Sequence, residues 1–361
     1  MSRMNPVLKA VAAVAVCAAL AMAQAAEFNP DIRPGEGVTA EKMLSDWFPP
    51  LVGSNLDTPV FILDSGKPGA TGLMIGGTHG NELAGQVAAL LALENAVVTA
   101  GKLLVVPYAN RSAMSMRDTR QNIAREHPVR SRSGERMLPY GDRRTDPADQ
   151  GVADPETYTN PKGYTLDNGA ESRNLNRTWP GDPDGSPTEQ LSYALMQMIL
   201  AEQVDFSLDM HEADTPERNT VGDDYRPGGN KRLSYTLVSH PRGLETAAFA
   251  LLEMEADTGI SMKLEESNSR YRGLSHLEIG DGSQCVSFLS ESPNPGQDRW
   301  REEADVVSDP KYPVTHRAGL HLRLFKHLAD SWGDMNGEVL EMQGLPEYEA
   351  LMSGGIGRYL N

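Results

Sequence analysis

The chain has 361 residues, with 33 basic and 50 acidic side chains and a formal net charge of −17. Apolar residues make up 39%, enough for a sizeable core in one large domain or two ordinary ones. The acidity argues against a nucleic-acid partner and against electrostatic attachment to an anionic membrane. Two cysteines, Cys17 and Cys285, provide no disulfide framework.

The first 26 residues predict a secretory signal peptide. Arg3 and Lys9 come before or at the start of an uncharged apolar run over 10–23, and small residues follow it. The run is shorter than the roughly 20 residues of a membrane-spanning helix, so we expect no stable membrane insertion after cleavage, with a retained anchor as the alternative. Cleavage leaves 31 basic and 50 acidic residues, a charge of −19. We expect the remaining chain, residues 27–361, to be periplasmic or secreted.

This remaining chain alternates short apolar runs, which predict strands, with helically spaced apolar residues. The expected elements are strands at 60–63 and 73–75, a helix at 81–97, a strand at 103–107, a helix at 188–202, strands at 204–210 and 234–239, a helix at 244–258, a strand at 285–289 and a helix at 315–332. This alternation predicts a single α/β domain, with a mixed, mostly parallel twisted sheet and helices on both faces.

Residues 112–173 interrupt this pattern. The segment is polar, rich in Arg, Asp, Gly and Pro, and has no helical or strand periodicity. A stretch of this length is either disordered or a functional loop system. We therefore treat it as a long polar loop insertion within the domain.

The segment from Gly76 to Gly85 carries the densest chemical signal. It follows a predicted strand and opens a helix, at the sheet edge where open α/β folds bind ligands. His79 is expected in the turn and Glu82 in the first helical turn, close enough to hold one cation, with Asn81 or Gly80 as the helix cap. Taken alone, the segment from His79 to Glu82 is better explained as a capped helix after a tight turn.

A third ligand comes from the predicted strand at 204–210. His211 follows it at the same carboxyl edge, and Asp209 lies two residues earlier on the same face, where it can orient an imidazole. His211 alone fits an ordinary strand-end histidine. Together with His79 and Glu82 it predicts a site for one zinc ion.

Two further segments add charged groups. Glu291 follows the predicted strand at 285–289, where a carboxylate can act as general base on water and then as acid to the leaving amine; a turn carboxylate is the alternative. Asn176 and Arg177 lie in a loop bounded by Pro180 and Gly181, which suits capture of a carboxylate; a structural turn arginine is the alternative.

In these motifs the chain resembles the zinc carboxypeptidase superfamily, with the closer likeness to its succinylglutamate desuccinylase and aspartoacylase branch. The resemblance covers about residues 73–296 and implies the fold of that superfamily. It implies zinc on His79, Glu82 and His211, a catalytic base at Glu291, carboxylate binding by Asn176 and Arg177, and a carbonyl-polarising arginine at Arg111.

Three departures from that branch bear on the substrate. The insertion at 112–173 is longer, only 70 residues follow Glu291, so that the separate C-terminal β-domain is absent or reduced, and Asn174 stands where an acid is more usual. Four residues fall where a substrate-binding loop is expected, and the sequence does not choose among Tyr225, Arg270, Tyr271 and Arg272.

We therefore expect an exported zinc hydrolase that cleaves an amide bond next to a carboxylate, on a small-molecule or peptide substrate. One alternative is a periplasmic metallocarboxypeptidase acting on peptides or muropeptides. Another is a non-catalytic carboxylate-binding protein, although a binder has no need of Glu291 beside a metal.

Overall fold

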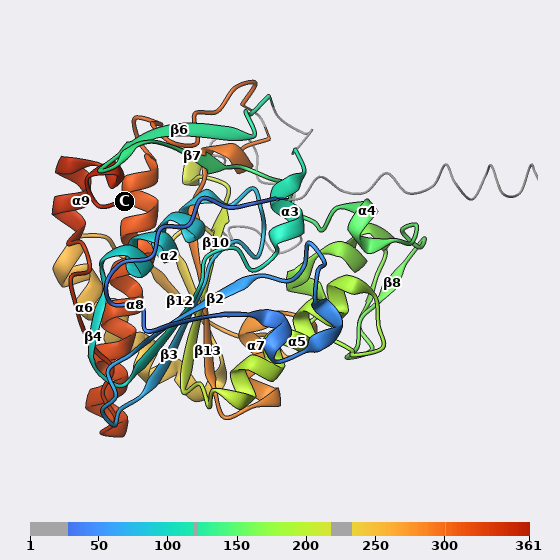
Figure 1. The fold of residues 1–361 in the computed structure, drawn as a ribbon, viewed down its shortest axis with the longest axis horizontal. Coiled ribbons are helices and arrows are strands. Elements are labelled where there is room, and N and C mark those ends of the chain that lie inside the picture. Colours follow the sequence, from blue (N-terminus) through green and yellow to red (C-terminus); the bar gives the residue numbers. More distant parts are fainter. Residues whose placement is uncertain (1–27, 118–121, 218–232, 300) are drawn as a thin grey trace, which may run out of the picture.

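An eight-stranded mixed sheet forms the centre of the computed structural model, which describes residues 28–117, 122–217, 233–299 and 301–361 (Figure 1). The strand order is β1-β2-β5-β3-β10-β13-β11-β12. Neighbours among the central strands β5, β3, β10 and β13 are parallel, whereas β2 is antiparallel to β1 and β5, and β11 is antiparallel to β13. The strands are β1 Ala40–Met43, β2 Pro59–Asp64, β3 Thr71–Ile75, β5 Lys102–Val106, β10 Phe206–Ala213, β11 Thr236–Ser239, β12 Lys263–Glu266 and β13 Val286–Pro293.

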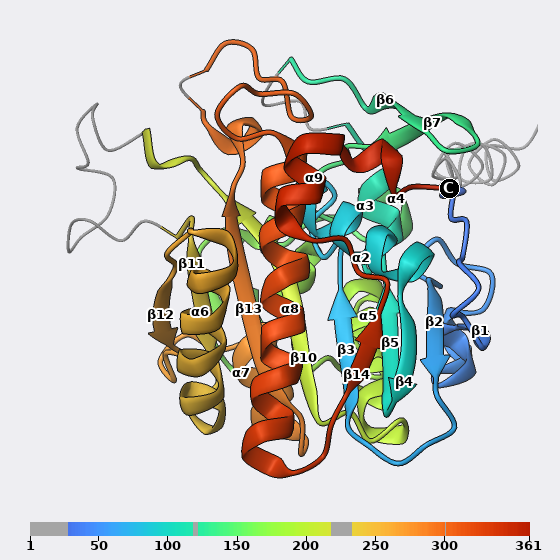
Figure 2. The same ribbon diagram turned by 90° about the vertical axis from the view of Figure 1, so that its left-hand side faces the viewer.

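Helices cover both faces of this sheet, which confirms the predicted fold class (Figure 2). Alternate strand residues face opposite sides, so Met74 packs with α2, α6 and α8, while Leu73 and Ile75 pack with α5. The helices are α2 Leu83–Asn95, α5 Pro187–Ala201, α6 Leu244–Thr258, α7 Ser275–Gly282, α8 Val314–Asn336 and α9 Tyr348–Gly354.

Helix α2 is buried along almost its whole length. Every residue from Leu83 to Glu94 is buried, because the helix lies against β10 and β3 and also contacts α8. A helix that is apolar on all sides is typical of this enclosed position. The first turn of α2 is therefore held from several directions.

The described residues of the insertion, 112–117 and 122–173, form short elements that leave no periodic signal in the sequence. They are α3 Arg111–Ser115, the hairpin β6 Glu126–Ser131 with β7 Gly134–Pro139, α4 Pro147–Gln150, and the hairpin β8 Tyr158–Thr159 with β9 Thr165–Leu166. Each of these pieces has only two to six residues, which is too short for an apolar repeat to show in the sequence.

All ten predicted strands and helices are present, with shifted ends. Besides those of the insertion, the strands and α-helices that were not predicted are short: β1, β12, α7 and α9 above, and the pair β4 Val97–Ala100 with β14 Glu341–Gln343. The predicted signal peptide lies outside the described residues. Within the described ranges, no helix has the length and apolarity needed to cross a bilayer.

Candidate active site

The turn between β3 and α2 carries His79 and Glu82 to the carboxyl end of the central strands. Gly77 has φ +68°, a left-handed conformation that glycine adopts without strain. Glu82 is the N-cap of α2, so the caps predicted at Asn81 or Gly80 are wrong. The chain is still in a turn at Asn81, whose carbonyl accepts from the side chain of Asn294.

Helix α2 approaches β10 closely. A Cβ at Gly85 would lie 2.3 Å from the carbonyl oxygen of Met210, so only glycine allows this contact. Glu212 of β10 accepts a 3.0 Å hydrogen bond from a backbone amide in the first turn of α2. These two contacts fix the start of the helix on the strand and bring Glu82 opposite His211.

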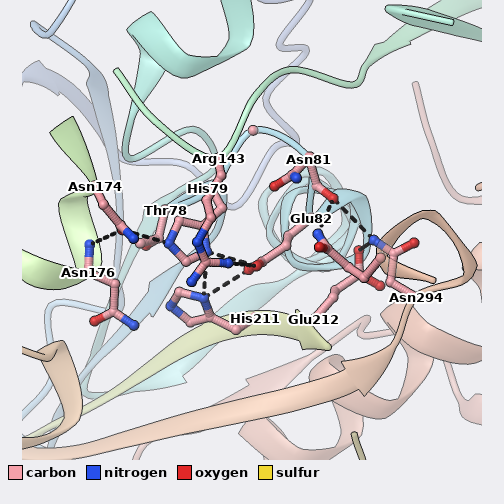
Figure 3. Close-up of polar contacts among 12 residues, drawn as sticks. Thr78, His79, Asn81, Glu82, Arg143, Asn174, Asn176, His211, Glu212 and Asn294 are labelled. Atoms are coloured by element: carbon pink, nitrogen blue, oxygen red, sulfur yellow. Dashed lines mark hydrogen bonds and ion pairs between the residues drawn. The ribbon is translucent and has the colours of Figure 1, made fainter. Parts of the chain in front are cut away.

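The three predicted metal ligands meet in one buried group (Figure 3). His79 Nδ1 lies 2.7 Å from Glu82 Oε1, and His211 Nδ1 lies 2.8 Å from Glu82 Oε2. The two Nδ1 atoms are 3.2 Å apart. All three side chains are at most 2% exposed.

This group fits a zinc ion. Four ligands at about 2.0–2.1 Å in a tetrahedron lie about 3.3 Å from one another, close to the separations found here. Two imidazole nitrogens and a carboxylate form a donor set of catalytic zinc sites, which keep a further position for water or substrate. Two ring nitrogens 3.2 Å apart, beside a carboxylate, also suit a shared cation.

Outer partners orient both histidine rings. Asp209 Oδ2 lies 2.9 Å from His211 Nε2, as the sequence predicted. Asp209 itself accepts hydrogen bonds of 2.8 Å from Thr78 Oγ1 and 2.6 Å from Ser275 Oγ. On the other side, His79 Nε2 lies 2.9 Å from Asn174 Oδ1. Each ring therefore turns its Nδ1 towards Glu82.

The surroundings also set the charge of the group. Burial, with Arg143 adding, lowers the pKa of His79 to about 4, so this ring is neutral at physiological pH. Burial opposes charge on His211 as well, but Asp209 and Glu82 outweigh it and hold the pKa of His211 well above its usual range. The same histidines outweigh burial at Glu82 and hold the pKa of that carboxyl low.

Glu291 lies beside this group. It pairs with His211 in the parallel register of β13 and β10, so both side chains project from the same face of the sheet. Its Oε2 is covered from solvent and has no hydrogen-bond partner among the described residues. Burial raises the pKa of Glu291 to about 8, with His211 opposing and Glu82 adding to the rise.

Asn176 and Arg177 end a short 3₁₀ helix, Leu175–Arg177, near the same group. Asn176 is buried, and its Oδ1 accepts from the backbone amide of Ser275 at 2.9 Å. Arg177 Nε lies 3.6 Å from Glu171 Oε2. Burial, followed by the charge of Arg143, lowers the pKa of Arg177. The two arginines therefore lie near each other beside the metal group.

The role predicted for Arg111 is wrong in this structure. Its guanidinium bonds the carbonyls of Phe28 and Asp57, at 2.8 and 3.0 Å, and Asn29 Oδ1 at 3.2 Å, so it ties down the segment before β1. Arg143, in contrast, lies at this group, with Nη1 3.4 Å from Glu82 Oε1.

The insertion forms part of the site. The amide of Gly80 donates to the carbonyl of Asp142 at 2.7 Å, which fixes the segment bearing Arg143 against the metal turn. Tyr164 packs on Tyr271 with ring centroids 4.9 Å apart, and Tyr271 lies 5.7 Å from the guanidinium of Arg177.

The structure distinguishes among the four candidates for the substrate-binding loop. Tyr271 is the one beside Arg177, while Arg272 turns away to pair with Glu278 and Asp281. The backbone amide of Arg270 donates to Asn268 Oδ1 at 3.0 Å. Tyr225 lies outside the described residues.

Sequence reasoning missed Arg143 and the contact between Asn174 and His79. The excess of arginine within 112–173 was a signal for the insertion as a whole, but Arg143 and Arg144 are adjacent and differ in nothing local. Only the contact of Asp142 with Gly80 distinguishes them.

In sequence comparisons, no protein-family model and no curated protein matches the chain. Similar solved structures include a succinylglutamate desuccinylase from a Silicibacter species, at 18% identity and a TM-score of 0.42, covering 81% of this chain and 64% of that one. A succinylglutamate desuccinylase/aspartoacylase from Rhodobacter sphaeroides has 18% identity and a TM-score of 0.44, covering 88% and 70%. Csd4, a D,L-carboxypeptidase from Helicobacter pylori, has 15% identity and a TM-score of 0.45, covering 79% and 56%.

The first two structures are of the branch that the sequence motifs resemble. The chain spans a little under two thirds of the Silicibacter protein and just over half of Csd4.

Proposed function

We propose that the chain is a zinc-dependent hydrolase of an amide bond next to a substrate carboxylate, an acyl-amino-acid deacylase in type. The observation that carries this is the unpartnered Oε2 of Glu291 beside the group of His79, Glu82 and His211. A site that only binds a metal has no need of a free carboxylate in that place. The predicted signal peptide supports action outside the cytoplasm.

Zinc and Glu291 have separate roles in the proposed reaction. When bound, zinc polarises the scissile carbonyl and makes water a better nucleophile. Glu291 takes the proton from the attacking water and returns it to the leaving amine. The positive charge of the metal favours the carboxylate form of Glu291, which burial disfavours.

Two arginines handle the negative charges of the substrate. Arg143 lies beside Glu82 and is placed to stabilise the oxyanion that develops on the carbonyl. Arg177, with the amide of Asn176, binds the carboxylate next to the scissile bond. The Tyr164–Tyr271 pair forms one wall near Arg177.

The test compares two variants. Glu291→Gln should keep one zinc per chain but lose about 10²–10⁴-fold in kcat, because a glutamine cannot accept the proton. His79→Ala should lose the zinc, because it removes one of three protein ligands. Metal analysis and turnover on N-acyl amino acids and on peptides, with and without a chelator, measure both effects.

The matched control is Glu349→Gln, which replaces an exposed carboxylate on α9. It should change neither the zinc content nor kcat. Wild-type turnover in Glu291→Gln would remove Glu291 from the mechanism, and a full zinc complement in His79→Ala would refute the ligand set. Release of C-terminal residues from peptides, without hydrolysis of N-acyl amino acids, would favour the carboxypeptidase alternative.

A further inference from the structure

The side chain of Asn174 bridges a metal-ligand histidine and a carboxylate. Its Oδ1 lies 2.9 Å from His79 Nε2, and its Nδ2 donates to Glu171 Oε2 at 2.7 Å. Asn174 is fully buried, and the side chain of Glu171 is 13% exposed. The bridge therefore lies in a place where water competes little for these hydrogen bonds.

Glu171 and the backbone amide of Asn176 together orient the side-chain amide of Asn174, because Asn176 N–H donates to its Oδ1 at 3.0 Å and Glu171 accepts from its Nδ2. A carboxylate only accepts hydrogen bonds, so the amide nitrogen must face Glu171 and the amide oxygen must face His79. His79 Nε2 must then carry the hydrogen, which leaves the lone pair on Nδ1, the nitrogen that faces Glu82. The carboxylate and the backbone amide of Asn176 thus select, through one side-chain amide, the tautomer that can bind a metal. Of the two, only the carboxylate adds a negative charge to the chain of hydrogen bonds that ends at His79.

The same carboxylate contacts the arginines of the pocket. Glu171 forms an ion pair with Arg144 and lies 3.6 Å from Arg177 Nε. Glu171 therefore contacts Arg177 directly and is linked to His79 through Asn174. His211 differs, because its outer partner is the carboxylate of Asp209 without an intervening amide.

We propose that Glu171 is a positioning residue that fixes His79 through Asn174 and thereby couples zinc affinity to the occupancy of Arg177. The inference rests on the proposed function, since it takes the metal group and the carboxylate role of Arg177 from there. The positive charge of Arg177 partly neutralises the negative charge of Glu171. When a substrate carboxylate binds Arg177, more of that charge acts on Asn174 and His79, and the metal is held more tightly. By reciprocity, bound zinc strengthens carboxylate binding.

The first test measures zinc affinity by competition with a chromogenic chelator, without any substrate. Glu171→Gln should weaken zinc binding about 10-fold, because a neutral side chain no longer polarises the hydrogen bonds that run from residue 171 through Asn174 to His79. Glu156→Gln makes the same charge change at an exposed position of the insertion and should leave zinc affinity unchanged. Equal affinities of Glu171→Gln and the wild type would overturn the proposal.

The second test moves the carboxylate by one residue. Asn174→Asp combined with Glu171→Gln places the acid directly on His79, with the glutamine amide able to donate to it. This double variant should bind zinc within about threefold of the wild type, as expected when the outer partner is restored. Failure of this rescue, in a folded protein, would also count against the proposal.

The third test is a double-mutant cycle with Arg177→Met. Removing the arginine should tighten zinc binding, and by a larger factor when Glu171 is present than in the Glu171→Gln background. Equal factors in the two backgrounds would show that Arg177 acts on the metal only through space, and would overturn the coupling.

The outcomes separate this inference from the proposed function. A wild-type chain that binds zinc but hydrolyses nothing would refute the hydrolase proposal. The zinc affinities of the variants would still test the role of Glu171. A hydrolysing wild type with unchanged zinc affinity in Glu171→Gln would refute the coupling alone. A wild type without zinc affinity would overturn both.

Discussion

The role of each charged residue in this site depends on which hydrogen-bond partners it has. Glu291 and Glu212 lie on neighbouring central strands, yet Glu212 accepts from Arg317, Asn294 and the start of α2, whereas Glu291 Oε2 has no partner in the described chain. A satisfied buried carboxylate holds structure together, and an unsatisfied one next to a metal group can accept a proton. Arg111 and Arg143 also differ in their partners, because Arg111 bonds backbone carbonyls of Phe28 and Asp57 whereas Arg143 contacts Glu82.

We predict that Arg143→Met lowers kcat by about 10²–10³-fold while zinc stoichiometry is retained, because an oxyanion donor is lost. Steady-state kinetics and metal analysis measure the two quantities. Arg111→Met is the matched control: it loses bonds to Phe28 and Asp57, so it should lower the unfolding temperature but not the turnover of folded enzyme. The reverse pattern of activities would restore the assignment drawn from sequence resemblance.

At the scale of elements, the site depends on how α2, β10 and β13 meet. The parallel register aligns His211 with Glu291, and the close contact of α2 with β10 brings Glu82 to His211. The insertion adds Arg143 because its backbone bonds the glycine of the metal turn. No one of these elements carries the whole site.

We predict that Gly85→Ala lowers both zinc affinity and stability. The added Cβ would lie 2.3 Å from a backbone oxygen of β10, so the helix must shift away and take Glu82 with it. Overpacking of this kind costs about 1–3 kcal/mol. Chelator competition and urea unfolding measure the two effects.

Gly354→Ala on α9 is the control for this helix glycine. Its nearest neighbour is the flexible side chain of Arg358 at 3.1 Å, so it should be neutral or slightly stabilising. A Gly85→Ala protein with wild-type zinc affinity would show that the approach of α2 to β10 does not set the metal group.

At the scale of the whole molecule, burial keeps several histidines uncharged. Burial lowers the pKa of His316 to about 4, and those of His276 and His321 to about 3. The unfolded chain has ordinary histidines near 6.5, so it binds these protons first as the pH falls. Each histidine therefore contributes stability above about pH 6.5 that is lost towards its folded pKa.

We predict that His316→Gln makes the protein less sensitive to acid. His316 bonds the hydroxyls of Tyr235 and Tyr348, far along the chain from the metal ligands. Between pH 7.5 and 5.5, the fall in unfolding free energy should be smaller by about 1 kcal/mol in the variant than in the wild type. Urea unfolding at the two pH values measures this difference. An identical fall in both proteins would mean that His316 is not held neutral by the fold.

Much of this site was predictable because its signals are local. His79 and Glu82 lie three residues apart in a glycine-rich turn, and His211 and Glu291 lie at the ends of apolar runs that read as strands. Parallel strands bring such ends to one edge, so the group of His79, Glu82 and His211 followed from the pattern and is confirmed. Arg143 did not follow, since it lies in a segment whose short elements leave no periodicity.

The sequence by itself determined the α/β class, the main strands and helices, and the residues that form the metal group. Periodicity and strand ends report on these features directly, because burial of one face imposes them. The tertiary structure alone decided that Arg143 rather than Arg111 reaches the site, that the oxygen of Glu291 has no partner in the described chain, and that Asn174 links His79 to Glu171. The contacts of Arg143 with Glu82 and of Asn174 with His79 join segments distant in the chain, and no local pattern encodes which polar side chains end up facing one another.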